Sequence, residues 1–590
     1  MRIKNEHRSE LIKACTGAVE NDIVIKNVNI VNVFTGEILF GHIGIYKGFI
    51  SYVEYDKNCT IKAKTEYDYK GKYAIPGLID AHVHIESSMM TPRNFCAAVL
   101  PHGTTTVITD PHEIANVLGV EGVKYMVESS VDLPMRQYIL APSCVPAVLN
   151  AEEAGASFSR EEVKEILKFD NVLGIAEVMD FMGVVEDEPR MKEILEMGLS
   201  KDVYIQGHAP LLSKNNLAAY LCGGPTSDHE CSNHDEVLEK IRYGMYIDGR
   251  ETSIVKDIET IVGVCKDFKY KDFLTICTDD RESEDILHEG HVNYVLNCAI
   301  KAGLDPVDAI KCSTLNVARE IGITNLGAIA PGYAADIIIC PVIDEIKPKA
   351  VFSKGVLAAK DGKLEVGIES KKFAAEEINT VKVPEISADD LKIKAPLTNG
   401  KAVVNAVGCH GMSPYTTKEE VEVEVKDGYV DIGAQPDLSY VAVINRHGPG
   451  NISLGIVKNF GLKEGAAGCT ISHDSHNLTL VYDKPENALL CINELKKLKG
   501  GLACAINGKL EARLKLEVAG LMTTTPCEEL VKEVNLVKQT LKRQGLTDVA
   551  NPILRVAILA LPVIPEFVIT DKGLVDVFTK QFVPLFLKRG

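Results

Sequence analysis

From Tyr73 onward the chain repeats one pattern, in which a short apolar segment is followed by a longer segment with helical periodicity. Strands that alternate with helices are typical of a parallel sheet, because parallel neighbours need a long crossover connection. Eight apolar segments follow this pattern, and eight is the strand number of a TIM (β/α)8 barrel. We therefore predict an α/β barrel over residues 73–334, with strands at 74–79, 105–109, 137–141, 172–176, 203–206, 225–227, 245–247 and 274–277.

The segments on both sides of this repeat follow other patterns. Residues 1–72 contain short alternating strands and 335–370 return to strand character, so we predict one small composite β-sandwich domain built from both flanks. Residues 371–397 are charged and contain two prolines, which indicates a linker. Residues 398–590 mix strands with helices, and we predict an added C-terminal domain of α/β or α+β class.

Composition limits the function classes. The net charge of −18 argues against a surface for nucleic acid or anionic membrane. No apolar run has the length of a signal-peptide core at the start of the chain or of a membrane span further on. The 16 cysteines are scattered, which favours reduced thiols. We expect a cytoplasmic protein with a small-molecule substrate.

Residues of the types that bind metal ions follow five of the predicted strands. Each alone has an ordinary explanation, such as a hydrogen-bonded core histidine or a helix cap. Together they lie where barrel enzymes carry their catalytic groups, at the carboxyl ends of the strands. They are His82 and His84 after the first strand, Glu177 after the fourth, His208 after the fifth, His229 after the sixth, and Asp279 and Asp280 after the eighth.

This set suits a centre of two divalent ions, which needs a bridging carboxylate, several imidazoles and a terminal carboxylate around a nucleophilic water. Between the two aspartates we favour Asp279, because it follows the strand directly. Imidazole and carboxylate ligands without thiolate suit Mn²⁺, Fe²⁺ or Zn²⁺, and the sequence alone does not choose among them. We assign His82, His84 and Asp279 to one ion, His208 and His229 to the other, and Glu177 to the bridge.

Seven segments along nearly the whole chain carry specific motifs. They read PGLIDAHVHIESSM (76–89), TVITDPHEIANVLG (106–119), CTDDR (277–281), EGHVNYVLNCAIKAGLDPVDAIKCSTLNVAREIG (289–322), LGAIAPGYAADIII (326–339), NRHG (445–448) and SHDSHN (472–477). This set resembles the adenine deaminase family of the amidohydrolase superfamily. The resemblance implies hydrolytic deamination of adenine to hypoxanthine and ammonia, a reaction of purine salvage. We further expect a homodimer or a higher homo-oligomer.

By this resemblance, a hydroxide between the two metal ions attacks C6 of the purine ring, and Asp279 carries its proton towards the leaving amine. A second acid is needed at the ring nitrogen beside C6, where charge otherwise builds up. Our candidate is Glu113, which follows the second strand. The structural alternative is a capping box, with Asp110 before Pro111 at a helix start and Glu113 closing it.

Further polar residues are candidates for substrate contact or for support of the metal ligands. The SHDSHN loop of the C-terminal domain either makes an interface between domains or reaches the barrel mouth, where it would close over the substrate or hold another metal. The candidates are Glu86, Asp110, His112, Asp280, His473 and His476.

Two alternatives stay open. Glu177 at the end of the fourth strand, with no lysine nearby, excludes the lysine-bridged amidohydrolases but not an N-acetylglucosamine-6-phosphate deacetylase-like amide hydrolase. The chain shows no obvious anion site for such a substrate. The other alternative is a non-catalytic barrel that serves as a scaffold, although buried imidazoles and carboxylates without metal would be costly.

Overall fold

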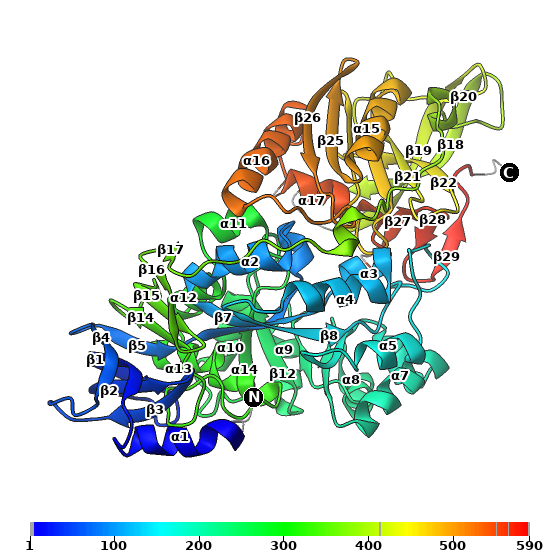
Figure 1. The fold of residues 1–590 in the computed structure, drawn as a ribbon. Helices are drawn as coiled ribbons and strands as arrows, with labels where there is room; N and C mark the ends of the chain where they lie inside the picture. The colour runs from blue at the N-terminus through cyan, green and yellow to red at the C-terminus, as the bar shows by residue number, and fades with distance from the viewer. Residues whose placement is uncertain (1–4, 412, 414, 550, 564–565, 588–590) are drawn as a thin grey trace.

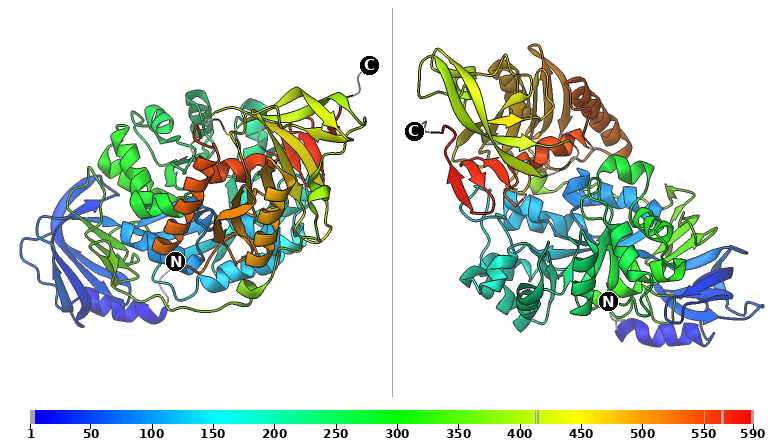
Figure 2. Two further views of the ribbon diagram at one scale, coloured as in Figure 1. Left: turned by 90° about the horizontal axis from the view of Figure 1, so that it is seen from above. Right: turned by 180° about the vertical axis from the view of Figure 1, so that it is seen from behind.

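The computed structural model describes residues 5–411, 413, 415–549, 551–563 and 566–587. A central α/β region separates a small sheet at one end from the C-terminal domain at the other (Figure 1), and the two further views in Figure 2 agree with this arrangement. Within the described residues, no helix combines the length and the apolar character that a bilayer crossing requires.

The central region contains eight parallel strands in two sheets. The first sheet orders its strands β10-β9-β8-β7-β6 and the second β11-β12-β13. Their bounds are β6 (Leu78–Val83), β7 (Thr104–Thr109), β8 (Arg136–Ala141), β9 (Val172–Val178), β10 (Tyr204–Gly207), β11 (Ser227–Asp228), β12 (Tyr246–Arg250) and β13 (Leu274–Cys277).

Backbone hydrogen bonds connect the two parallel sheets on both sides. The Thr226 amide donates to the Ile205 carbonyl at 3.1 Å, and the Asp279 amide donates to the His82 carbonyl at 3.0 Å. One buried cluster includes side chains from β6, β7, β8, β9 and β13, so the sheets curl around a shared interior. The predicted strands are thus present in the predicted order.

Helices connect these strands, as expected for parallel neighbours (Figure 1). Several begin at a proline, which fits the first helical turn because no partner is needed there for its missing N–H. The helices of the central region are α2 (Pro92–Val99), α3 (His112–Leu118), α4 (Val120–Ser129), α5 (Arg160–Ile166), α6 (Phe181–Val185), α7 (Pro189–Ser200), α8 (Lys214–Cys222), α9 (His234–Arg242), α10 (Ile258–Cys265), α11 (Ser283–His288), α12 (Val292–Lys301), α13 (Pro306–Cys312) and α14 (Leu315–Glu320).

The predicted first strand, 74–79, is wrong in its bounds because it joins two strands. β5 (Tyr73–Pro76) pairs with β1 and β14 of the small sheet, and β6 begins after Gly77. A side chain at Gly77 would place its Cβ 2.3 Å from Thr105 Oγ1, so only glycine fits at the crossing between the sheets. The shift extends β6 to Val83 and places His82 inside the strand.

The flanking strands are hydrogen-bonded in one nine-stranded sheet, where we had expected a sandwich. Its order is β17-β16-β15-β14-β5-β1-β2-β3, with β4 paired to β1. Side chains from both flanks share one buried cluster. The remaining elements are α1 (Asn5–Cys15), β1 (Asn21–Asn32), β2 (Glu37–Tyr46), β3 (Phe49–Glu54), β4 (Ala63–Asp68), β14 (Ile337–Cys340), β15 (Ala350–Ser353), β16 (Val356–Lys360) and β17 (Lys363–Leu364).

The C-terminal domain is built on a second nine-stranded sheet, of order β20-β19-β18-β22-β21-β24-β23-β25-β26. Its neighbouring strands are antiparallel except for the parallel pair of β18 and β22. The strands are β18 (Gly400–Cys409), β19 (Thr416–Lys426), β20 (Tyr429–Asp431), β21 (Leu438–Ile444), β22 (Ile452–Lys458), β23 (Ala466–Cys469), β24 (Leu478–Tyr482), β25 (Gly501–Ile506) and β26 (Lys509–Lys515). The helices α15 (Pro485–Leu498), α16 (Cys527–Arg543) and α17 (Pro552–Ala557) and a sheet of β27 (Phe567–Thr570), β28 (Gly573–Asp576) and β29 (Gln581–Val583) complete it.

The C-terminal domain packs on the loops that follow the central strands (Figure 1). The Thr523 amide donates to the Met89 carbonyl at 2.9 Å, directly after the first barrel loop. Lys538 of α16 pairs with Glu282 at 2.6 Å and with Glu284 at 2.7 Å, next to α11. The domain therefore covers the carboxyl ends of the strands, where the predicted site residues lie.

Candidate metal centre and interdomain pocket

The predicted metal ligands meet at one point of the central region. Five of them are buried and His208 is partly exposed. Parallel strands bring residues from distant parts of the chain together at their carboxyl ends. The residues are His82 within β6, His84 after it, Glu177 within β9, His208 after β10, His229 after β11 and Asp279 after β13.

His82, His84 and Asp279 form the first group. The two Nε2 atoms of the histidines lie 3.1 Å apart. Asp279 Oδ1 lies 3.7 Å from His82 Nε2 and 3.4 Å from His84 Nε2. The neighbouring Asp280 instead accepts a hydrogen bond from Ser87 Oγ at 2.5 Å. Asp279 is thus the aspartate that faces the histidine pair.

The two oxygens of Glu177 face two different groups of imidazoles. Oε1 lies 3.4 Å from His84 Nε2 and 4.0 Å from His82 Nε2. Oε2 lies 2.7 Å from His208 Nδ1 and 3.1 Å from His229 Nε2. The single carboxylate therefore spans the two groups.

Hydrogen bonds fix the proton positions of the first two imidazoles. Gln206 Nε2 donates to the Ala81 carbonyl at 3.0 Å, so its Oε1 faces His82 Nδ1 at 2.8 Å. His84 Nδ1 lies 3.0 Å from the Asp110 carbonyl. Both partners are acceptors, so both Nδ1 atoms carry hydrogen and both Nε2 atoms present lone pairs.

Two Nε2 atoms 3.1 Å apart that both lacked a hydrogen would repel each other, so a proton or a cation must lie beside them. Burial would lower the pKa of His84, but Glu177 raises it well above the ordinary value, so the surroundings favour positive charge at this point. Carboxylates and imidazole lone pairs around one point are the donor set of a divalent cation. The residues present therefore fit metal ions.

Arg250, at the end of β12, was missed in the sequence analysis. It donates to Asp279 Oδ2 at 2.6 Å and to Glu230 Oε2 at 2.9 Å. Burial would raise the pKa of Asp279, but Arg250 and then the imidazoles hold it below its usual range. The signal that could have revealed Arg250 is its place after the seventh predicted strand, in line with the other site residues.

Asp110 and His112 lie beside this cluster. Asp110 accepts a hydrogen bond from the His112 amide at 2.9 Å, and its second oxygen lies 3.1 Å from His112 Nδ1. His112 Nδ1 is 3.4 Å from Glu177 Oε1. These two residues connect the start of α3 to the bridging position.

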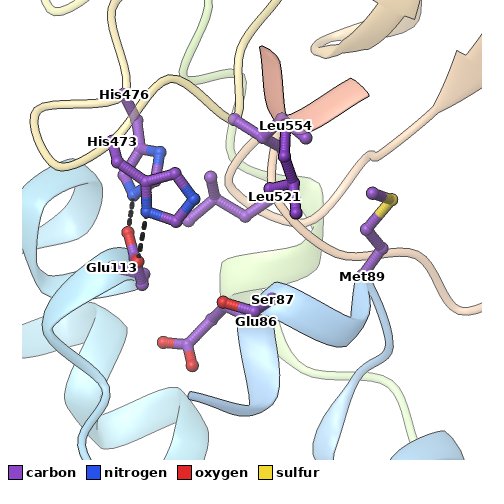
Figure 3. Close-up of a pocket in the computed structure, with 9 residues that line it drawn as sticks. Glu86, Ser87, Met89, Glu113, His473, His476, Leu521 and Leu554 are labelled. Carbon is purple, nitrogen blue, oxygen red and sulfur yellow. Dashed lines mark hydrogen bonds and ion pairs between the residues drawn. The ribbon is translucent and has the colours of Figure 1, made fainter. Parts of the chain in front are cut away.

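Glu113 does not close a capping box at this helix start. Its Oε1 lies 2.7 Å from His473 Nδ1, and its Oε2 contacts His476 Nε2 (Figure 3). Although burial alone would raise the pKa of Glu113, the charges of His473, His476 and His112 bring it well below its usual range. The SHDSHN loop thus reaches the carboxyl ends of the central strands and contacts this carboxylate.

A pocket opens beside Glu113, between the central region and the C-terminal domain (Figure 3). It has an empty volume of about 330 Å³, its mouth included. The lining residues are Glu86, Ser87, Met89 and Glu113 from the central region and Ile471, His473, His476, Leu521 and Leu554 from the C-terminal domain. Glu86 accordingly lines a cavity, and its role in substrate contact stays a prediction.

Comparisons with known proteins agree along the whole chain. A family model described as "Amidohydrolase family" matches residues 73–364, and one described as "Adenine deaminase C-terminal domain" matches residues 413–581. The chain is 37% identical over 584 residues to "Adenine deaminase 2" of Carboxydothermus hydrogenoformans, with 98% of this chain and 99% of that protein covered. It is 37% identical over 581 residues to "Adenine deaminase" of Kosmotoga olearia, with 98% and 99% covered. With "Adenine deaminase" of Clostridium acetobutylicum it shares 38% identity over 580 residues, with 97% and 99% covered.

Proposed function

Because the chain belongs to the adenine deaminase family of the amidohydrolases, we propose that its metal-ligand cluster and its interdomain pocket work together in the hydrolytic deamination of adenine. The reaction forms a bond from C6 to a water oxygen, breaks the bond from C6 to the amino nitrogen, and releases hypoxanthine and ammonia. The amidohydrolase segment carries the predicted metal ligands, and the family-specific C-terminal segment carries His473 and His476.

We assign two divalent cations to the cluster. His82, His84 and Asp279 would hold one, His208 and His229 the other, and Glu177 would bridge them. The observation that carries this assignment is the pair of Nε2 lone pairs 3.1 Å apart. Bound there, the cations supply Lewis-acid activation of the attacking water. Mn²⁺ is our first choice, and Fe²⁺ and Zn²⁺ suit the same donors.

Asp279 is the proposed carrier of the water proton. Its Oδ1 faces the two histidines, while Arg250 holds Oδ2 at 2.6 Å and keeps the carboxylate ionised. An ionised carboxylate in this place can take the proton of the attacking water and release it to the leaving amino group.

Glu113 and His473 together are our candidates for protonating the ring nitrogen beside C6. Glu113 is held as a carboxylate and cannot itself bring a proton. Burial would lower the pKa of His473, but Glu113 raises it to about 9, so this imidazole holds a proton at neutral pH. His473 can hand that proton to Glu113 across their 2.7 Å contact.

The amide hydrolase alternative is not favoured. Its phosphorylated substrate would need a cationic group that is free to bind an anion. Arg250 lies at the cluster but already donates to Asp279, Glu230 and Asp257. Glu86 and Glu113 are the charged side chains that line the pocket besides the two histidines, and no lysine or arginine belongs to this lining within the described residues.

We further propose that the eight parallel strands close into one TIM barrel, supported by the hydrogen bonds between the two sheets. A homodimer or higher homo-oligomer in the cytoplasm, without nucleic-acid or membrane partners, remains our proposal. The net charge of −18 supports the absence of nucleic-acid and membrane partners, and the free thiols at all 16 cysteine positions support the cytoplasmic location.

The test measures adenine turnover through the loss of the adenine ultraviolet band. It compares enzyme purified with Mn²⁺, the same enzyme after chelation, and the chelated enzyme after metal is restored. We expect turnover to vanish on chelation and to return with metal, with about two ions bound per chain. Turnover that survives complete metal removal would refute the metal assignment. Full metal content without adenine turnover would refute the proposed reaction.

A further inference from the structure

Within the described part of the chain, Glu86 contributes a carboxylate oxygen without a hydrogen-bond partner to the interdomain pocket. It lies in the 3₁₀ helix η1 (Ile85–Ser88), directly after the histidine pair, and only 4% of it is exposed. Its Oε1 accepts a hydrogen bond from the Ile114 amide at 3.3 Å. Its Oε2 is buried and has no hydrogen-bond partner among the described residues.

Ser87 and Glu113, the other pocket residues with side-chain oxygens, are already engaged, whereas His476 Nδ1 is a second buried atom without a partner among the residues that the structure describes. Ser87 donates its hydroxyl hydrogen to Asp280, and both oxygens of Glu113 contact the two imidazoles. The remaining lining residues are apolar: Met89, Ile471, Leu521 and Leu554. A buried carboxylate oxygen without a donor is costly, so the pocket suits a flat, mostly apolar ligand that offers one N–H group.

A free adenine base offers hydrogen to acceptors at only two places. The amino group at C6 must face the metal-ligand cluster, because this group leaves during the reaction. The other donor is the N–H of the imidazole ring. A nucleoside lacks it, because the sugar replaces this hydrogen.

We propose that Glu86 Oε2 accepts a hydrogen bond from the imidazole-ring N–H of the substrate and so makes the enzyme selective for free purine bases over 9-substituted ones. The inference rests on the proposed function of the neighbouring cluster. It adds a residue of the pocket lining (Figure 3) that recognises the imidazole ring of the purine.

The test combines a change in the protein with a change in the ligand. In Glu86→Gln the Ile114 amide still needs an acceptor, so the new amide places its oxygen there and its NH₂ group in the pocket. A donor would then face the substrate N–H. The matched control is Glu54→Gln, a buried glutamate of the small sheet whose carboxylate also accepts a backbone amide, that of Thr60 at 2.7 Å.

Turnover of adenine and 9-methyladenine is compared in the native enzyme and both variants under the same conditions. Calorimetric binding of hypoxanthine and 9-methylhypoxanthine gives a readout that does not depend on turnover. We expect Glu86→Gln to lower kcat/KM for adenine about tenfold or more and to reduce the preference over 9-methyladenine by the same factor, with metal content unchanged. Glu54→Gln should alter neither.

Two results would overturn the inference. One is an unchanged preference in Glu86→Gln, which would mean that the methyl group is excluded by shape alone. The other is equal binding of both product analogues by the native protein. Absence of adenine turnover in the native, metal-loaded enzyme would instead refute the proposed function.

Discussion

Replacing Arg250 with methionine should raise the pKa of Asp279 and lower the stability of the protein, and both changes can be measured. The substitution keeps the volume of the apolar stem but removes the cation that donates to Asp279, Glu230 and Asp257. A hydrogen bond to a charged group contributes about 1.5–3 kcal/mol, which corresponds to a rise of about 1–2 units in the pKa of Asp279. Leaving buried carboxylates without their partner should also lower the free energy of unfolding by about 3–5 kcal/mol.

The assay is the pH dependence of kcat for adenine deamination, together with urea unfolding. A rise of about 1–2 units in the pKa of Asp279 moves the acid limb of the profile to higher pH by the same amount. Asp279 stays ionised at neutral pH, so the loss of activity should appear on the acid side of the profile. Arg250→Lys, which keeps one charge but loses the forked geometry, should lie between the native enzyme and Arg250→Met. An acid limb in the same place for all three proteins, with stability unchanged, would refute the role given to Arg250.

Three further changes test the remaining roles. Glu177→Gln should weaken metal retention about 100-fold or more, because a neutral amide cannot bridge two cations; metal analysis after dialysis checks this, and full metal content would contradict it. His473→Asn keeps a donor for Glu113 but not the proton, so kcat should fall about 100-fold at unchanged metal content, and a native kcat would exclude His473 from proton transfer. Burial, and then Asp474, raises the pKa of Glu152 from 4.5 to about 8, so native stability should fall as pH rises between these values. Glu152→Gln should remove up to about 5 kcal/mol of that dependence, and identical melting profiles from acid to alkaline pH would show that Glu152 does not titrate in this range.

The gathering of the metal-type residues could be predicted because it follows from chain order alone. Parallel strands end at one edge of a sheet. Imidazoles and carboxylates at these ends, such as His82, Glu177 and His229, therefore converge whatever the details of the helices. Of the two aspartates after β13, Asp279 is the nearer to the strand end, and its carboxylate is the one that faces the histidine pair.

Three features could not be predicted in this way. The break at Gly77 lies inside a continuous apolar run, and only the crossing of two sheets, which depends on tertiary structure, separates β5 from β6. Arg250 resembles any charged residue at a strand end until its three carboxylate partners are placed around it. The contact between Glu113 and His473 joins residues 360 positions apart, which no local pattern records.

The late positions of His473 and His476 in the sequence also set the order in which the two parts of the site are synthesised. A chain leaves the ribosome from its N-terminus, and domains fold as they emerge. The ligand positions His82 to Asp279 precede His473 and His476 by almost two hundred residues or more. All the proposed metal ligands are therefore synthesised well before the loop whose histidines contact Glu113. Metal binding at the proposed ligands can therefore precede formation of the interdomain pocket. A polypeptide truncated before residue 473 is expected to bind metal without deaminating adenine.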